Sequence, residues 1–329
     1  MKKVLIICNP VAGSGTAQKI DRAAALLRAW GCRLDIVLTS KRGDAEVLAR
    51  QVRTREDLLV VAAGGDGTYN EVANGLSASA VPMAILPLGT TSVLAHEIGL
   101  STRIDDALFL AVHGEPEVIH LGRITLTSPA VGSEAGRPAT DTCVSHHFLL
   151  MAGIGFDGGT VRRVSQRMKR IAGKGAYVIS GIRECLNYQP NSLAFTVTPP
   201  YEIKKLPRTP APSRGDRAST LTLTGYGAVV GKASCYGGDF KVTPDARLTD
   251  PSLYLMVTHG NRRVDILRYA VGILAGRHLA FGDISYIKAE RVAIEGSAHV
   301  QIDGDYAGTT PAQIEVVPDA LRLVMRLRR

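Results

Sequence analysis

The 329-residue sequence has few cysteines and no long apolar run. The cysteines are scattered and odd in number, and none of them forms a C-x-x-C pair; they are Cys8, Cys32, Cys143, Cys185 and Cys235. This pattern excludes a disulfide framework and a cysteine-based metal site, and it predicts a reducing, cytoplasmic location. Because no apolar run reaches the ~18 residues of a membrane-spanning helix, and no signal-peptide pattern is seen, we expect neither a span nor a leader.

Aromatic and acidic residues are also scarce. Aromatic residues make up 5% of the chain, and 30 acidic residues face 39 lysines and arginines, which gives a net charge of +9. A surplus of positive charge favours an anionic partner: a membrane surface, a nucleic acid or a nucleotide. Nucleic acid is the least favoured of the three, because no aromatic residues interleave with the basic run over 162–174 to stack on bases. We therefore expect no nucleic-acid partner.

The most informative segment is Gly64–Thr68, which has the sequence Gly-Gly-Asp-Gly-Thr. It follows an apolar run over 58–63, typical of a buried strand, and it precedes a predicted helix over 69–76. At a strand–turn–helix junction, glycines without a Cβ let backbone N–H groups approach a phosphate. A carboxylate beside a phosphate, at Asp66, is explained by a bound Mg²⁺. Taken alone, the segment is also compatible with a tight turn in which Asp66 caps the helix.

Three further strand–turn–helix units surround this segment. Their predicted strands are Val4–Cys8, Arg33–Thr39 and Met83–Leu88, and the helices that follow are expected over 16–30, 46–52 and 94–98. Four such units in about 100 residues predict a parallel sheet with helices on both faces. Ligands of such sheets bind at the carboxyl ends of the strands, where all the glycine-rich turns lie.

The second half of the sequence has a different pattern. From Val118 onward, short β-branched or alternating runs predict an antiparallel, β-rich domain. We therefore expect two domains, 1–117 and 118–329, with the extreme C-terminus packing back on the first.

A basic helical stretch over 158–186 interrupts these strands. Its arginines Arg162, Arg163 and Arg167 are candidate contacts with anionic lipid headgroups. A solvated helix face, which binds nothing, is the alternative interpretation.

Four motifs in a fixed order resemble those of one family. They are Asn9-Pro10-x-x-Gly13, the Gly64–Thr68 segment, Pro87-Leu88-Gly89-Thr90 and Asp303-Gly304-Asp305. Together they resemble the diacylglycerol kinase and sphingosine kinase family of lipid kinases, most closely its soluble bacterial members, over nearly the whole chain. The resemblance implies an α/β nucleotide-binding domain like that of NAD kinases and phosphofructokinases, a β-rich sandwich domain, and an active site in the cleft between them.

The resemblance also implies a reaction: phosphoryl transfer from ATP, with Mg²⁺, to a lipid hydroxyl such as that of diacylglycerol. It assigns Asp303 as the general base and Asp66 as a ligand of the catalytic Mg²⁺. The implied nucleotide-binding residues are Asn9, Thr39, Gly64, Gly65, Asp66, Gly67, Thr68, Asn70 and Thr90. Without the family pattern, Asp303 is explained as a turn aspartate in an Asp-Gly pair.

A second, structural Mg²⁺ site is implied after Pro244-Asp245-Ala246, a segment that holds this ion in some bacterial members. The matching ligands are the Asp250 carboxylate and the Ser252 backbone carbonyl. The family pattern is altered here, because Thr249 replaces an acid and Pro251 replaces a glycine. A Pro-Asp turn without metal is an equally good explanation.

The family pattern is altered in two other places. Ser92 and Val93 replace an Asn-Asp pair, and Asp305 replaces a glutamate. Three alternatives to a lipid kinase stay open: an NAD kinase-like phosphotransferase, a non-catalytic lipid or nucleotide sensor, and a basic nucleic-acid binder. Peripheral association with an anionic membrane is expected, and a homodimer is compatible with the sequence.

Overall fold

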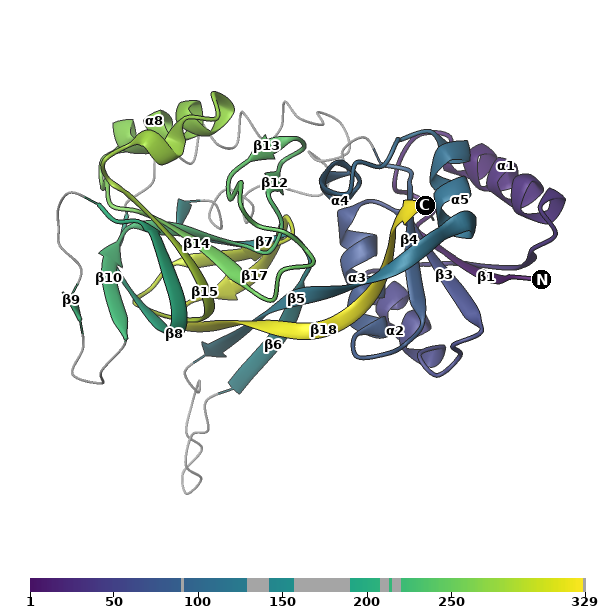
Figure 1. Ribbon diagram of the computed structural model, residues 1–329, viewed down its shortest axis with the longest axis horizontal. Helices are drawn as coiled ribbons and strands as arrows, with labels where there is room; N and C mark the ends of the chain where they lie inside the picture. The colour runs from purple at the N-terminus through teal and green to yellow at the C-terminus, as the bar shows by residue number, and fades with distance from the viewer. Residues whose placement is uncertain (90–91, 129–141, 157–189, 208–212, 215–219, 328–329) are drawn as a thin grey trace, which may run out of the picture.

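The computed structural model describes residues 1–89, 92–128, 142–156, 190–207, 213–214 and 220–327. Two domains lie side by side, and long strands pass from one to the other (Figure 1). The elements of the first domain are β1 (Lys3–Cys8), α1 (Thr16–Ala29), β2 (Arg33–Leu38), α2 (Asp44–Gln51), β3 (Leu58–Gly64), α3 (Asp66–Leu76), β4 (Pro82–Pro87), α4 (Val93–Glu97) and α5 (Ile104–His113).

The strands of the first domain form a parallel sheet in the order β4-β3-β1-β2. Both faces of this sheet are covered, which explains why β1, β3 and β4 have nearly continuous apolar sequences, whereas the edge strand β2 alternates and is partly exposed. On β3, Val60 and Ala62 pack in the cluster that contains Val72 of α3, whereas Leu59 and Val61 pack in the cluster that contains Leu27 of α1. The predicted α/β domain with parallel strands is confirmed.

The second domain is β-rich and mostly antiparallel. Its elements are β5 (Gly114–Ser128), β6 (Thr142–Phe148), β7 (Met151–Ile154), β8 (Leu193–Lys205), β9 (Ser213–Arg214), β10 (Leu221–Gly225), β11 (Gly227–Gly231), β12 (Cys235–Tyr236), β13 (Phe240–Lys241), β14 (Leu253–Thr258), α8 (Arg263–Leu274), a short 3₁₀ helix (His278–Ala280), β15 (Ile284–Glu295), β16 (His299–Ile302), β17 (Asp305–Thr309) and β18 (Ala312–Leu327). The predicted β-rich domain is confirmed, and α8 is a helix that the sequence pattern did not reveal.

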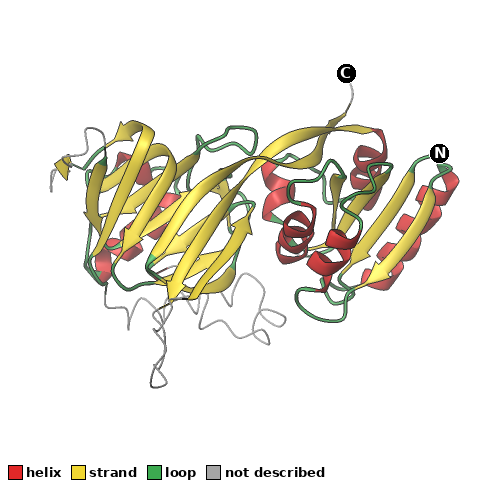
Figure 2. Ribbon diagram, turned by 90° about the horizontal axis from the view of Figure 1, so that it is seen from below, coloured by secondary structure: helices red, strands yellow, loops and turns green. Residues whose placement is uncertain are grey.

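β5 and β18, both labelled in Figure 1, join the two domains, and Figure 2 shows long strands crossing from one domain to the other. They pair antiparallel over most of their lengths, and β18 also pairs with β15 of the second domain. At its far end β18 lies parallel to β4, with Arg322 opposite Pro82 and Leu323 opposite Met83. The last strand of the chain therefore extends the sheet of the first domain.

Candidate functional site

The Gly64–Thr68 segment forms the turn between β3 and α3. Gly65 is the residue before the helix, with an extended backbone (φ −117°, ψ −173°), and its carbonyl accepts the N–H groups of Thr68 (2.9 Å) and Tyr69 (3.1 Å). A Cβ placed on Gly65 would meet no atom within 4 Å. The first turn of α3 thus presents backbone N–H groups and the positive end of a helix dipole beside open space, an arrangement that suits a phosphate.

The glycine-rich turns predicted from the sequence meet at one edge of the sheet. The carbonyl of Gly64 accepts hydrogen bonds from Tyr69 Oη (2.9 Å) and from the backbone N–H groups of Leu88 (3.0 Å) and Gly89 (3.3 Å). A Cβ on Gly13 would stand 2.3 Å from the carbonyl oxygen of Leu88. The turns after β1, β3 and β4 are therefore packed against each other.

Asn9 and Thr39 lie at the same edge. The Asn9 backbone N–H donates to the carbonyl of Ala63 (2.9 Å), and the Thr39 N–H donates to that of Cys8 (2.9 Å). The Asn9 side-chain oxygen accepts the N–H of Val11 (3.1 Å), which fixes the start of the turn after β1. Asn9 is thus placed beside the turn of Gly64–Thr68, and Thr39 lies one strand farther along the same edge, beside β1.

Asp66 holds a second helix. Its two carboxylate oxygens accept the backbone N–H groups of Val93 (2.9 Å) and Leu94 (3.0 Å), which are the first two residues of α4. Burial raises the pKa of this carboxyl, and the two N–H donors partly oppose the shift. The carboxylate serves as an N-terminal cap of α4, in addition to its place in the turn.

The opposite end of α4 is attached to the second domain. Oε2 of Glu97 accepts the Ser234 N–H (3.0 Å), the Ser234 hydroxyl (2.8 Å) and the Cys235 N–H (3.0 Å). One short helix therefore links the carboxylate of Asp66 to the segment that leads into β12.

Asp303 and Gly304 form the two-residue turn between β16 and β17. Both have positive φ angles, 47° and 85°, as in the hairpin turns that favour Asp-Gly. The Asp303 carboxylate accepts four hydrogen bonds, from the backbone N–H groups of Leu149 (2.7 Å), Leu150 (2.9 Å) and Met151 (3.0 Å) and from Asn70 Nδ2 (2.8 Å). It thereby binds the hairpin to the start of β7 and to α3.

The Asp303 carboxylate is desolvated, although the residue as a whole is only partly buried. Burial raises its pKa to about 6, and the N–H donors partly oppose the shift. Asn70 also donates to the carbonyl of His147 (3.0 Å). This one side chain of the first domain therefore binds two acceptors of the second, the Asp303 carboxylate and the His147 carbonyl. The fold brings together Asn70, predicted to bind the nucleotide, and Asp303, predicted to be the general base, and the two side chains hydrogen-bond to each other.

The Asp305 carboxylate faces the turn of Gly64–Thr68. Its Oδ2 lies 3.8 Å from the position that a Cβ on Gly67 would occupy, and 3.3 Å from Nη2 of Arg42. Arg42 belongs to the turn between β2 and α2, so the ion pair crosses from one domain to the other. Arg42 follows a strand whose carboxyl end lies at the edge of the sheet where ligands of such folds bind. That position in the sequence could have identified Arg42 as a candidate site residue.

The predicted structural Mg²⁺ site holds ammonium groups instead. Nζ of Lys232, a fully buried residue, donates to the backbone carbonyls of Arg247 (2.5 Å) and Asp250 (2.8 Å). Burial lowers the pKa of Lys232 to about 7, against the opposing effect of Asp250 and Glu97. The Asp250 carboxylate pairs with Lys288 (2.9 Å) and accepts the Tyr254 hydroxyl (3.3 Å).

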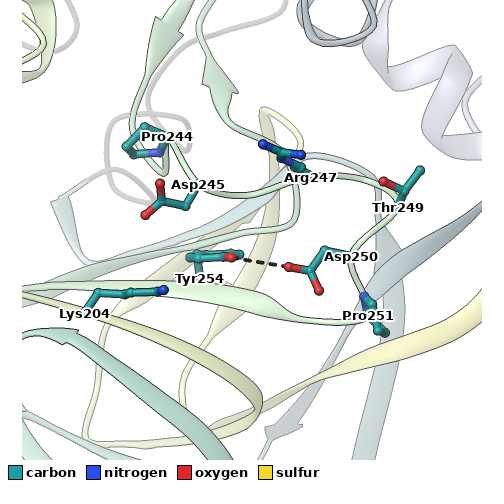
Figure 3. Close-up of a pocket in the computed structure, with 8 residues that line it drawn as sticks. All are labelled: Lys204, Pro244, Asp245, Arg247, Thr249, Asp250, Pro251 and Tyr254. Atoms are coloured by element: carbon teal, nitrogen blue, oxygen red, sulfur yellow. Dashed lines mark hydrogen bonds between the residues drawn. The ribbon is translucent and has the colours of Figure 1, made fainter.

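Asp250 borders a polar groove of about 540 Å³, lined by Lys204, Pro244, Asp245, Arg247, Thr249, Asp250, Pro251 and Tyr254 (Figure 3). The backbone N–H of Ser252 donates to the Asp250 carbonyl (2.7 Å). Because lysine ammonium groups bind both the carboxylate and the carbonyl of Asp250, this segment does not fit a divalent cation.

Some predicted residues cannot be placed. Thr90, Arg162, Arg163 and Arg167 lie outside the described residues. Within the described part of the chain, no three Asp, Glu, His or Cys side chains are grouped as metal ligands. None of the helices in those same ranges is long and apolar enough to span a bilayer.

Two family models match the chain. Residues 3–124 match the diacylglycerol kinase catalytic domain, and residues 151–325 match the YegS C-terminal NAD kinase beta sandwich-like domain, which alone covers more than half of the chain. This chain belongs to the diacylglycerol kinase family. The family membership confirms the resemblance carried by the four motifs, and it makes a kinase of the lipid kinase class the expected activity.

Relatives align with this chain over nearly its whole length. A diacylglycerol kinase of Mycobacterium tuberculosis (strain ATCC 25618 / H37Rv) is 28% identical over 326 residues, which cover 98% of this chain and 94% of the relative. A diacylglycerol kinase of Bacillus subtilis (strain 168) is 27% identical over 332 residues, covering 99% and 97%. The crystal structure of a candidate diacylglycerol kinase from Bacillus anthracis str. Sterne has a TM-score of 0.71 at 21% identity, covering 99% and 95%. At that identity the structural likeness supports the fold.

Proposed function

We propose that this family member transfers the γ-phosphoryl group of ATP to the hydroxyl group of a membrane lipid, with diacylglycerol as the first acceptor to test. The proposal is carried by one juxtaposition, in which Asp305 of the second domain faces Gly67 in the first turn of α3. A phosphate held by the N–H groups of that turn would lie beside a carboxylate. The names of the relatives support diacylglycerol as the acceptor.

In the proposed reaction, the lipid hydroxyl oxygen attacks the γ-phosphorus, and the bond from that phosphorus to the β–γ bridging oxygen breaks. ADP leaves with the electron pair, and the hydroxyl proton passes to the Asp305 carboxylate. Arg42, paired with Asp305 at 3.3 Å, would supply positive charge beside the transferred group. A Mg²⁺ ion that enters with ATP would be held mainly by phosphate oxygens and water.

Asp305 suits the role of the base better than Asp303 does. A pKa of about 6 is compatible with a general base, but the four hydrogen bonds accepted by Asp303 match the lone-pair capacity of one carboxylate. We therefore regard Asp303 as a positioning residue that fixes the turn preceding Asp305. Asp66 likewise acts by holding α4 against the phosphate turn.

The acceptor class is tested with pure protein, labelled ATP and Mg²⁺, offered diacylglycerol, sphingosine, NAD or no acceptor. Label transferred to a lipid supports the proposal and identifies the acceptor. Label transferred to NAD alone would establish an NAD kinase-like enzyme. ATP binding without transfer to any acceptor would point to a non-catalytic sensor.

A further inference from the structure

Helix α8 lies on the outer surface of the second domain (Figure 1). Its inner face is firmly seated: Tyr269 and Gly272 are buried, and a Cβ on Gly272 would stand 2.5 Å from the ring of Phe281. The Tyr269 hydroxyl donates to Asp283 Oδ2 (2.6 Å) and accepts the N–H of Gly260 (2.8 Å). The orientation of α8 on the domain is therefore fixed.

The outer face of α8 is apolar. Val264, Leu267, Val271 and Leu274 are 63%, 60%, 57% and 61% exposed. Their spacing of three, four and three residues places them in one line along the helix, about 15 Å long at 1.5 Å per residue. We call these four residues the α8 stripe. A continuous exposed aliphatic line of this kind marks an interaction surface, in contrast to single exposed apolar residues.

Positive charge flanks the α8 stripe at both ends. Arg262 precedes the helix and Arg277 follows it, and both are exposed. The nearby acids are engaged within the domain: Asp265 accepts the Arg262 backbone N–H (3.1 Å) and pairs with Arg268 (3.3 Å), and Asp283 binds Tyr269 and Arg268. The outward surface around α8 is thus aliphatic along the stripe and cationic at its ends, and the exposed Arg268 beside the stripe is paired with both acids.

We propose that the α8 stripe docks this protein on an anionic lipid bilayer, with the helix axis lying in the plane of the interface. Aliphatic side chains on one face and arginines beside them are the features of interfacial helices, which bury the apolar face at the headgroup boundary. The inference rests on the proposed function, because a lipid acceptor resides in a bilayer and the described helices do not span one.

A second copy of the chain is the weaker candidate partner. Because arginines lie at both ends of the α8 stripe, pairing two stripes in either direction would bring Arg262 and Arg277 of one copy near arginines of the other. Like charges in contact oppose such a pairing, whereas anionic headgroups complement both ends. The charge pattern therefore favours the bilayer.

The test is sedimentation of the full chain with vesicles of phosphatidylcholine mixed with phosphatidylglycerol, and with vesicles of phosphatidylcholine alone. Leu267→Gln/Val271→Gln should lower the partition coefficient on the mixed vesicles by about tenfold or more, since two aliphatic contacts are lost. Glutamine is a good helix former, so the helix should remain. Val47→Gln/Val144→Gln is the matched control, because these valines are 55% and 49% exposed elsewhere and their loss should leave binding unchanged.

The arginine flanks have their own test. Arg262→Gln/Arg277→Gln should weaken binding to the mixed vesicles and leave the weak binding to phosphatidylcholine unchanged, and added salt should produce the same loss in the wild type. Equal vesicle binding of the stripe variant and its control would overturn the proposal. The proposal would also be overturned if the wild type sediments as a dimer, the stripe variant sediments as a monomer, and vesicle binding is the same for both.

A soluble short-chain diacylglycerol separates docking from catalysis. The stripe variant should phosphorylate this acceptor at the wild-type rate while losing activity on vesicle-borne diacylglycerol. Vesicle binding that depends on the stripe, without kinase activity on any acceptor, would support docking and refute the proposed function. Normal kinase activity on vesicles in the stripe variant would refute docking alone.

Discussion

At the scale of single residues, Asp303 and Asp305 are two positions apart but have different surroundings. Asp305 faces Gly67 and Arg42, so Asp305→Asn should remove the proton acceptor and lower turnover by about 10²–10⁴-fold. The affinity for ATP should change little, since the N–H groups of the turn remain. Steady-state kinetics together with calorimetric titration of ATP would measure both quantities.

Asp303→Asn provides the contrast. One amide oxygen cannot accept four hydrogen bonds, and its NH₂ group would face N–H donors, so we expect a loss of about 2–4 kcal/mol in the free energy of unfolding. Urea denaturation measures this loss. Unchanged stability of Asp303→Asn, combined with a turnover defect larger than that of Asp305→Asn, would return the role of the base to Asp303.

The two leading glycines of the phosphate turn should also differ. Gly65 has open space at its Cβ position, so Gly65→Val should fold, but its side chain should obstruct the phosphate and weaken ATP binding by more than about tenfold. Gly64→Ala should instead destabilise the fold by about 1–3 kcal/mol, because its Cβ would stand 2.4 Å from Thr68 Oγ1. Calorimetric titration and thermal denaturation distinguish the two effects. A folded Gly65→Val protein with normal ATP affinity would remove the phosphate-turn assignment.

Lys232 supplies, at the predicted structural Mg²⁺ site, the hydrogen-bond donor to the carbonyls of Arg247 and Asp250. Lys232→Ala should destabilise the protein by about 3 kcal/mol or more, because a cavity forms and the carbonyls of Arg247 and Asp250 lose their donor. Mg²⁺ should raise the melting temperature of this variant and leave that of the wild type unchanged without nucleotide. Lys288→Ala, which removes the half-exposed partner of the Asp250 carboxylate, is the control. A wild-type melting temperature that rises with Mg²⁺ in the absence of nucleotide would contradict the assignment of Lys232 to this site.

At the scale of elements, α4 connects the phosphate turn to the second domain. Asp66 binds its first residues and Glu97 binds Ser234 and Cys235 at its end. Asp66→Asn and Glu97→Ala should therefore be coupled, with stability losses that differ from additivity by about 0.5–3 kcal/mol. Asp66→Asn combined with Arg22→Ala, which breaks a surface pair with Asp105, should be additive. Denaturation of the single and double variants tests this coupling. Additive stability losses for Asp66→Asn and Glu97→Ala would mean that α4 does not couple the turn of Gly64–Thr68 energetically to the second domain.

The elements themselves were largely predictable, because their signals are local. The apolar run of β3 and the glycines after it lie within ten residues, and the structure confirms both. The partners of the site residues are not local: Asp303 and Asn70 are 233 positions apart, and Glu97 and Ser234 are 137 apart. Helix α8 escaped prediction because it is apolar on its inner and outer faces, which hides the period of a half-buried helix.

At the scale of the whole molecule, the two domains share strands and core. β18 pairs with β15 and then with β4, and one hydrophobic cluster contains Val60 of the first domain together with Leu149 and Ala233 of the second. An interface of this kind, built of continuous strands and buried apolar side chains, should prevent either domain from unfolding alone.

The single tryptophan, Trp30, makes this expectation measurable. It follows α1, where it contacts Phe109 and His113, so its fluorescence reports on the first domain, whereas far-ultraviolet circular dichroism reports on the helices and strands of both domains together. Both signals should change in one coincident denaturant transition. Leu223→Ala lies in a core made only of second-domain residues and should cost about 2–5 kcal/mol. If the domains are one cooperative unit, this distant substitution must lower the denaturation midpoint seen by Trp30 fluorescence as far as the midpoint seen by circular dichroism. A fluorescence midpoint that stays at its wild-type value would show that the shared strands do not couple the domains.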